Sequence, residues 1–197
     1  MSTAEADSPA PVGDPDTRAR LLDAAIHIAS TSGLDKVTYR SVAAQAGLSH
    51  SLVRFYFGTG DAMIAEALER AAHLDVEESH LGGETLEEFL RDFLPVMGSE
   101  RNRGMLQYDY LLRAVRGGVP VERVTAIYDF YISEVARTLR ALDVPDPDGS
   151  IAAVVLAAVD GTILQHAIYG SGDRTERMLE RIRDLIRLLA DRSRSGH

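Results

Sequence analysis

Basic and hydroxyl-bearing side chains gather in residues 38–59 of a chain that is acidic overall. Arg40, His50 and Arg54 can donate hydrogen bonds both to phosphate oxygens and to the edges of bases. Residues 17–60 hold five bases (Arg18, Arg20, Lys36, Arg40, Arg54) and two acids (Asp23, Asp35), so their net charge is 5 − 2 = +3, whereas the whole chain carries −9. A positive segment before an acidic remainder favours a small polyanion-binding part on a body that does not bind polyanions.

Two short helices joined by a glycine turn are the elements expected to hold these side chains. Thr38 is a typical N-cap for the first helix, and Gly47 stands where a left-handed residue would end it. Ser49 is the expected N-cap of the second helix. Leu48 before this cap and Val53 four residues after it fit a hydrophobic staple, which fixes the direction of the second helix. This pattern predicts a helix-turn-helix.

The second helix is predicted to present a polar face to DNA. Its apolar residues Val53 and Phe57 would point inward. His50, Ser51 and Arg54 then point outward near the helix N-terminus, from which side chains reach base edges in the major groove. The start of the first helix can bind phosphate, because backbone N–H groups at a helix N-terminus attract anions. The full set of predicted DNA-binding residues is Thr38, Tyr39, Arg40, Ser49, His50, Ser51, Arg54, Tyr56 and Thr59.

The composition excludes several classes of protein. The 197 residues are 45% hydrophobic and include no cysteine, which excludes a disulfide scaffold, thiolate metal sites and thiol catalysis. The first residues lack the basic start and apolar core of a signal peptide. The apolar run 151–159 is followed by Asp160, so a buried helix is favoured over a membrane span. These features fit a cytoplasmic protein.

Apolar residues recur at helical spacing along the whole chain, and no segment shows the alternation typical of strands. Glycine and proline clusters divide the pattern into segments. The fold class is therefore predicted to be all-α, with about nine to ten helices. Beyond the two short helices, the expected helical segments are 17–32, 59–80, 84–97, 104–115, 121–142, 151–169 and 175–192.

Aromatic and methionine residues beyond residue 84 suit the wall of a ligand pocket, and they equally suit ordinary core packing. Asp109 and Asp129 lie among tyrosines, where each is either a polar anchor for a ligand or a surface carboxylate. The pocket candidates are Phe89, Phe93, Met97, Met105, Tyr108, Asp109, Leu111 and Tyr128.

The segment 151–169 is apolar nearly all round, so the other helices of one chain would not easily cover it. Paired with 121–142 from each of two subunits, it would form a four-helix interface. A dimer suits DNA recognition, because two helices can then read two half-sites. The interface candidates are Val154, Val155, Ala158, Ile163 and Ala167.

Catalytic and metal chemistry find little support. His73, Glu77 and His80 have the spacing of a metal set on one helix face, but a solvated helix end is the simpler interpretation. No Ser-His-Asp order, glycine-rich phosphate loop or carboxylate pair stands out. We therefore expect no enzyme, no metal and no cofactor.

Residues from Thr17 to about Leu68 resemble the N-terminal domain of tetracycline-repressor-like (TetR family) transcriptional regulators. The family commonly has tyrosine where this chain has Arg54 and lysine where it has Gly60. The matching residues are Leu21-Leu22-Asp23-Ala24-Ala25, Gly33, Val37-Thr38, Val42-Ala43, Ala46-Gly47-Leu48-Ser49, Tyr56-Phe57 and Asp61.

The resemblance implies a homodimeric repressor that a small-molecule effector releases from a palindromic double-stranded DNA operator. In the family, the last two long helices before the C-terminus form the dimer bundle. The alternative is a helical small-molecule-binding or adaptor protein that no longer binds DNA, an interpretation that Gly60 and the acidic total favour. The expected organisation is a disordered leader at 1–16, a three-helix DNA-binding domain at 17–62, a larger helical ligand-binding and dimerisation domain at 63–193, and a disordered tail at 194–197.

Overall fold

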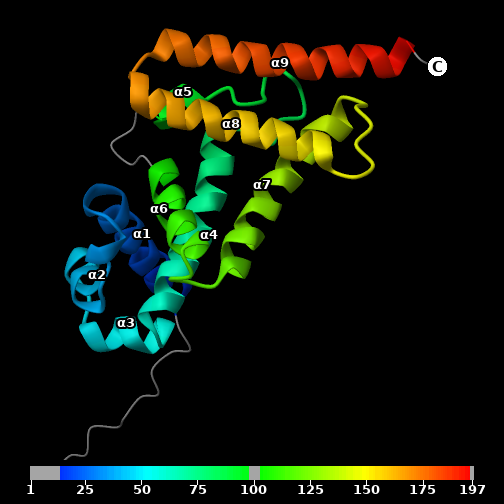
Figure 1. Cartoon of the computed structure of the whole chain (residues 1–197). Coiled ribbons are helices and arrows are strands. Elements are labelled where there is room, and N and C mark those ends of the chain that lie inside the picture. Colours follow the sequence, from blue (N-terminus) through cyan, green and yellow to red (C-terminus); the bar gives the residue numbers. More distant parts are fainter. Residues whose placement is uncertain (1–13, 98–102, 196–197) are drawn as a thin grey trace, which may run out of the picture. The chain divides into compact units, whose positions relative to one another are not determined.

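All regular elements in the described part of the chain are helices (Figure 1). The computed structural model describes residues 14–97 and 103–195, and the predicted all-α class is confirmed. The chain divides into two compact units, one ending at Ala67 and the other beginning at Leu68. The first unit contains α1 (Pro15–Ser32), the 3-10 turn η1 (Leu34–Lys36), α2 (Tyr39–Ala46), α3 (His50–Phe57) and the start of α4 (Gly60–Ser79). The second contains the rest of α4, α5 (Phe93–Met97), α6 (Arg103–Val115), α7 (Val121–Ala141), α8 (Ser150–Tyr169) and α9 (Gly172–Ser195).

Helix α1 begins two residues before the expected Thr17. Asp14 caps it, because its Oδ1 accepts a hydrogen bond from the backbone N–H of Asp16 at 3.2 Å, and Pro15 occupies the first helical position, where no N–H is needed. The rest of the predicted leader, residues 1–13, lies outside the described residues, as do residues 196 and 197 of the predicted tail.

The first unit is held together by the faces that α1, α2 and α3 turn toward one another. Helix α2 packs against both α1 and α3. Leu21, Val42 and Val53 are fully buried, each with an exposed fraction of 0%. Removing such a side chain from water stabilises the fold by about 1.5–3 kcal/mol, so these three residues fix how the two short helices are held.

The predicted helix over 84–97 is wrong for most of its length. The structure has turns and bends over residues 80–92, and only α5 is helical. Leu90 has a φ of 59°, a left-handed conformation that is costly for a residue with a branched side chain and that interrupts a right-handed helix.

Side chains from α7 and α9 bind the backbone of this irregular segment. The guanidinium of Arg183 donates to the carbonyl oxygens of Phe89 and Leu90, each at 3.0 Å. The hydroxyl of Thr138 donates to the carbonyl oxygen of Gly83 at 2.6 Å. These tertiary hydrogen bonds replace helical hydrogen bonds for three carbonyl oxygens. The spacing of apolar residues in the sequence does not reveal them.

Helix α8 packs against both α7 and α9 in the second unit, and α8 and α9 lie side by side in Figure 1. The core here is built from apolar faces of α7, α8 and α9, with Val135, Leu139 and Ile186 fully buried. Much of α8 nevertheless stays uncovered within one chain. Among the described helices, α8 alone has the length and hydropathy that would also suit a membrane span.

Candidate DNA-binding and ligand sites

Helix α2 is fixed at both ends by the residues that the sequence indicates. Thr38 Oγ1 accepts from the N–H of Ser41 at 3.1 Å, and Ser41 Oγ accepts from the N–H of Thr38 at 2.9 Å, which forms a capping box. Gly47 ends the helix in the left-handed conformation, with φ 66° and ψ 34°. The next N–H, that of Leu48, donates to the carbonyl of Ala43 at 2.9 Å. The predicted cap and left-handed glycine are therefore confirmed.

Helix α3 presents a polar face to solvent. Ser49 Oγ accepts from the N–H of Leu52 at 3.2 Å and so caps the helix. The inward residue Val53 is fully buried. His50 and Arg54 are exposed, as is Ser51. The orientation of α3 is as predicted, whereas the DNA contacts of its outward residues stay a prediction.

Two arginines on this unit carry charge that no acid neutralises. Arg40 and Arg54 are exposed, and neither forms an ion pair within the part of the chain that the structure describes. Arg18, by contrast, pairs with Glu66 and lies 5.0 Å from the ring centre of Phe57. Arg18 is thus a structural residue, whereas Arg40 and Arg54 remain available to an anion.

Tyr39 has a structural role as well as a place on the predicted surface. Its hydroxyl donates to the carbonyl of Gly58 at 2.8 Å, and its ring meets that of His50 edge to face at 5.6 Å between centroids. These contacts tie the start of α2 to both ends of α3. The hydroxyl of Tyr56 donates to the carbonyl of Asp14 at 3.4 Å, so both tyrosine hydroxyls already have partners within the unit.

Threonine and serine caps keep a donor for a ligand. Thr59 Oγ1 accepts from the N–H of Ala62 at 3.1 Å, which caps α4 as predicted. A hydroxyl that accepts a hydrogen bond still has its own O–H to donate. Thr59 can therefore cap α4 and contact phosphate at the same time.

Phe55 is a surface residue that reasoning from the sequence missed. Its side chain is 64% exposed. It lies four residues after Ser51, so the two share a side of α3. An aromatic residue in a short amphipathic helix is normally assigned to the core, and no spacing rule marks this one as exposed.

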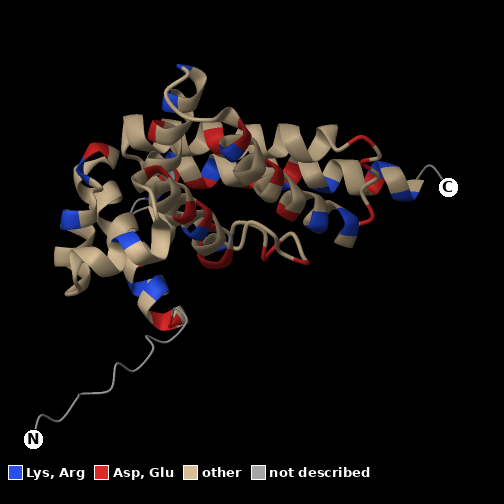
Figure 2. Ribbon diagram, turned by 90° about the horizontal axis from the view of Figure 1, so that it is seen from below, with Lys and Arg blue, Asp and Glu red and all other residues tan. Residues whose placement is uncertain are grey.

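The charge pattern of the helix-turn-helix differs from that of the rest of the chain. Residues 36–60 contain three bases and no acid. Basic and acidic residues are mixed along α1, α4, α6, α7 and α9, whereas α8 carries one acid, Asp160, and no lysine or arginine (Figure 2). The positive charge of residues 36–60 is thus not offset by any acid within that segment.

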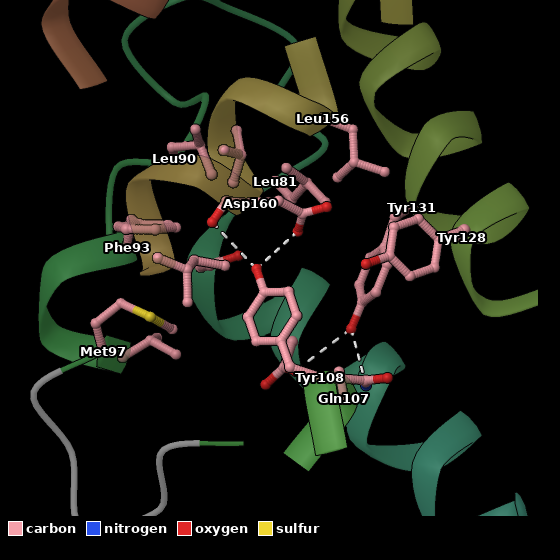
Figure 3. Close-up of a pocket in the computed structure, with 15 residues that line it drawn as sticks. Leu81, Leu90, Phe93, Met97, Gln107, Tyr108, Tyr128, Tyr131, Leu156 and Asp160 are labelled. Carbon is pink, nitrogen blue, oxygen red and sulfur yellow. Dashed lines mark hydrogen bonds between the residues drawn. The ribbon is translucent and has the colours of Figure 1, made fainter. Parts of the chain in front are cut away.

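The second unit contains a cavity of about 60 Å³. Its wall is contributed by α4, the irregular segment, α5, α6, α7 and α8 (Figure 3). The lining residues are Asp75, Ser79, Leu81, Leu90, Phe93, Val96, Met97, Gln107, Tyr108, Tyr128, Tyr131, Leu156, Val159, Asp160 and Ile163. A mainly apolar wall with a few polar groups is typical of a small-molecule site.

Two hydrogen-bonded groups form the polar part of the cavity. The hydroxyl of Tyr108 donates to Asp160, at 3.0 Å to Oδ1 and 3.2 Å to the carbonyl oxygen. On the other side, the hydroxyl of Tyr131 accepts from Gln107 Nε2 at 3.0 Å and lies 3.4 Å from Asp75 Oδ2 (Figure 3).

Arg103 provides the countercharge for Asp75. It is only 4% exposed, and its Nε donates to Asp75 Oδ1 at 2.7 Å. It also pairs with Glu78. Burial raises the pKa of the Asp75 carboxyl to about 6, and the bond to Arg103 opposes this rise.

Asp160 lacks such a countercharge among the described residues. Burial raises the pKa of its carboxyl, and hydrogen bonds from Tyr108 and Tyr128 oppose the rise. Burial also raises the pKa of Tyr128 to about 12 and that of Tyr108 further. Both phenols therefore remain neutral donors at physiological pH.

Residues 81–192 match the family model described as tetracyclin repressor-like, C-terminal domain. The chain belongs to the TetR family. Its members are non-enzymatic transcription factors, and the TetR fold seen here supports a DNA-binding regulator. No curated protein matches the chain.

Solved structures share the fold of this TetR-family chain. A putative TetR-family regulator from Rhodococcus sp. has a TM-score of 0.73 at 17% identity, covering 90% of this chain and 100% of that one. A putative regulator from Saccharomonospora viridis in complex with choline has a TM-score of 0.66 at 22% identity, covering 88% and 97%. The multidrug binding protein EbrR complexed with ethidium has a TM-score of 0.65 at 24% identity, covering 88% and 99%.

The cavity of this TetR-family chain contains some of the predicted pocket residues and not others. Phe93, Met97, Tyr108 and Tyr128 line it. Phe89, Met105, Asp109 and Leu111 do not. Phe89 is fully buried in the core, and Met105 is 42% exposed. Asp109 pairs with Arg113 at 3.4 Å, Asp129 is exposed, and neither carboxylate lines this cavity.

The carboxylates and one tyrosine of the cavity were missed. Asp160 interrupts an otherwise apolar helix, and that interruption is a signal that could have identified it. Asp75 lies in a run of acidic residues on α4, and Tyr131 lies close to Tyr128 and Phe130 on α7. Spacing along the sequence does not distinguish these two from their neighbours.

The predicted interface residues separate into three environments. Val154, Ala158 and Ala167 are exposed on α8, Val155 is 8% exposed within the core, and Ile163 lines the cavity. Ile163 is therefore turned toward its own subunit, whereas Val155 is mostly buried but still lines a surface groove beside Val154.

Helix α9, not α7, continues the exposed apolar face of α8. Leu185 and Leu188 on α9 are 60% and 59% exposed and line a surface groove with Val154 and Ala158. The expected partner of α8, the helix over 121–142, contributes no residue to this groove. The sequence shows the apolar spacing of α9. Which of its apolar side chains stay exposed depends on which side of the helix faces the core.

The possible metal set on α4 does not converge. No group of three or more His, Asp or Glu side chains among the described residues could hold a metal ion. The ring of His73 packs against that of Phe130 at 4.3 Å between centroids.

Proposed function

We propose that the protein is a homodimeric, cytoplasmic transcriptional repressor that a small-molecule effector releases from a palindromic operator. The observation that carries the proposal is a pair of exposed arginines on a capped helix-turn-helix, Arg40 and Arg54, which form no ion pair with any described acid. Uncompensated guanidinium groups in this setting favour a phosphate surface as the partner.

In the proposed complex, α3 lies in the major groove. Arg54 reads guanine through a bidentate contact, and His50 and Ser51 reach neighbouring base edges. The exposed ring of Phe55 contacts a thymine methyl group. Arg40 and the capping hydroxyls of Thr38, Ser49 and Thr59 contact phosphate, while Tyr39 and Tyr56 mainly hold the two helices in place.

The α8–α9 face is proposed as the dimer interface. It is defined by Val154, Ala158, Ala167, Leu185 and Leu188, all exposed on one chain. Four helices, two from each subunit, would cover these side chains. A two-fold dimer reads half-sites whose centres lie about 34–36 Å apart, one turn of DNA.

The cavity is proposed as the effector site, and α4 as the element that responds to it. Helix α4 contributes Asp75 and Ser79 to the cavity, and its first residues, from Gly60, belong to the first unit. An effector can release the operator only if it binds one arrangement of α4 more tightly than the other. Choline and ethidium, bound in two of the similar structures, are both organic cations.

Binding to a random duplex at low salt tests the DNA-binding part. Fluorescence anisotropy across a salt series should give a negative slope of log affinity against log salt. Because the dimer carries each arginine twice, the variant R40A/R54A should reduce the size of that slope by about four units if both arginines contact phosphate, and by about two if Arg54 contacts a base only.

Arg116→Ala is the matched control, because it removes an exposed arginine of the second unit. Its slope should equal that of the wild type. An unchanged slope in R40A/R54A, or no duplex binding by any form, would instead support the alternative of a small-molecule-binding or adaptor protein.

A further inference from the structure

The cavity wall is acidic and aromatic. Among the described residues, its lining includes two carboxyl groups and three tyrosines, but no lysine, arginine or histidine. An anionic effector would meet no positive side chain in this lining. The chemistry of the wall therefore restricts the ligand class.

We propose that the cavity binds a compact organic cation, with Asp160 as its countercharge. This inference rests on the proposed role of the cavity as the effector site. It adds the class of effector, which the family does not specify, and the residue that recognises its charge.

The two carboxylates of the cavity differ in their partners. Asp75 is already paired with the buried Arg103. Asp160 has only tyrosine hydroxyls as partners among the described residues, with Tyr108 at 3.0 Å. A carboxylate removed from water is costly unless it is paired. A cationic ligand would provide the missing partner for Asp160.

Aromatic rings supply the rest of a cation site. Tyr108, Tyr128 and Tyr131 line the cavity together with Phe93. Tyr128 and Tyr131 meet edge to face, with 6.5 Å between their ring centroids. Aromatic faces attract ammonium groups, most strongly where water is excluded. The same rings suit the methyl groups of a quaternary ammonium, which have no hydrogen bonds to donate.

The size of the cavity favours a small ligand. Its volume is about 60 Å³, well below the roughly 300–1,000 Å³ of typical drug-sized sites. A compact head group such as trimethylammonium is therefore a better match than an extended planar dye.

A neutral polar ligand is the main competitor. Burial favours the protonated form of Asp160, and a protonated carboxyl would donate a hydrogen bond to a hydroxyl or carbonyl group. A pair of ligands with the same shape and different charge separates the two possibilities. Choline and 3,3-dimethylbutan-1-ol form such a pair, because a carbon atom replaces the charged nitrogen.

Isothermal titration of the full chain with each compound, near pH 8, tests the proposal. Choline should bind at least about tenfold more tightly than the neutral alcohol, a difference of about 1.4 kcal/mol. Asp160→Asn should remove this preference. Asp109→Asn is the matched control, since that carboxylate lies outside the cavity and is 47% exposed.

Equal binding of the two compounds, or no choline binding, would overturn the proposal. Retention of the choline preference by a folded Asp160→Asn variant would also overturn it. If that variant does not fold, the comparison of choline with the neutral alcohol on the wild-type protein decides between a cationic and a neutral ligand. Duplex binding by the same preparation separates the two ideas: a protein that binds DNA but not choline keeps the proposed DNA-binding function and loses only this inference.

Discussion

At the scale of single residues, Arg54 and Phe55 show what side-chain type can and cannot predict. Arg54 was assigned to the outer face of α3 because the apolar residues Val53 and Phe57 were expected to point inward. Phe55 is its neighbour and is also exposed. An aromatic residue is compatible with either side of a short helix, so only the packing of α3 on α2 reveals its position.

Arg54→Ala is expected to weaken operator binding by about 1–3 kcal/mol for each half-site, because a bidentate contact with guanine contributes about that much discrimination. Competition binding against duplexes changed at single positions is the measurement. The variant should lose its preference at one base pair in each half-site. The same loss of affinity for every duplex would show that Arg54 contacts phosphate instead.

Choline binding is expected to weaken as the pH falls, because the two carboxyl groups of the cavity become protonated and lose their negative charge. Burial raises the pKa of Asp75 to about 6 and raises that of Asp160 as well. Both therefore lose their negative charge at a higher pH than in the unfolded chain. The charge of choline does not titrate, so its affinity should fall by up to about tenfold per pH unit for each group that becomes protonated.

Titrations between about pH 8 and about pH 4, near the ordinary pKa of an aspartate, check this dependence, with the neutral alcohol as the control that should change little. The charged and titratable groups that face the two carboxyls are Arg103, Glu78 and Tyr131 around Asp75, and Tyr108 and Tyr128 around Asp160. Choline affinity that is constant across this range would contradict a carboxylate as the recognising group.

At the scale of elements, local chemistry predicted the helix-turn-helix well. Thr38, Ser49 and Thr59 cap the helices that the sequence assigned to them, and Gly47 is left-handed. Each signal acts within a few residues, so a single sequence contains it. The segment over 80–92 could not be predicted, because Thr138 and Arg183, which bind its carbonyls, lie far away in sequence.

Two glycine substitutions should change stability in opposite directions. Gly47→Ala places a Cβ on a residue with φ 66°, which should lower the free energy of unfolding by about 1–2 kcal/mol. Gly60→Ala adds a Cβ with nothing within 4 Å, at a helical position without positive φ. It should raise stability by about 0.5–1 kcal/mol.

Urea titrations followed by circular dichroism measure both effects. The pair is informative because neither added methyl group meets a neighbouring atom. The difference between the two changes in unfolding free energy therefore reports the effect of backbone conformation. A neutral Gly47→Ala substitution would show that this turn does not need the left-handed conformation.

At the scale of the whole molecule, the distinction between core and interface was the hardest to predict. Apolar residues surround α8, and the sequence correctly indicated that one chain could not cover them all. Which of them stay exposed depends on how α7 and α9 pack. Val155 and Val154 are adjacent in sequence, yet one is 8% exposed and the other 69%.

The cavity shows the same limit. Its polar groups come from α4, α6, α7 and α8, and no spacing rule connects residues on four different helices. The sequence identified tyrosines and carboxylates as suitable ligand groups. It could not show that Asp75 and Asp160, rather than Asp109 and Asp129, face the same space.

Leu188→Arg is expected to produce monomers, because a charge on the α8–α9 face would be buried without a partner in the dimer. Sedimentation equilibrium gives the mass, and circular dichroism should show unchanged helicity, since Leu188 is 59% exposed in one chain. Leu112→Arg is the control, as Leu112 is 49% exposed on α6. A variant L188R that remains a dimer would place the interface elsewhere.

We propose that a two-fold pair of α3 helices reads duplex DNA, and selection of bound DNA from a random pool by the intact protein is the sharpest test. The enriched pool should contain an inverted repeat whose half-sites are centred about 10–10.5 base pairs apart or a multiple of that. A pool that remains random after repeated rounds, or a consensus without two-fold symmetry, would contradict the proposal.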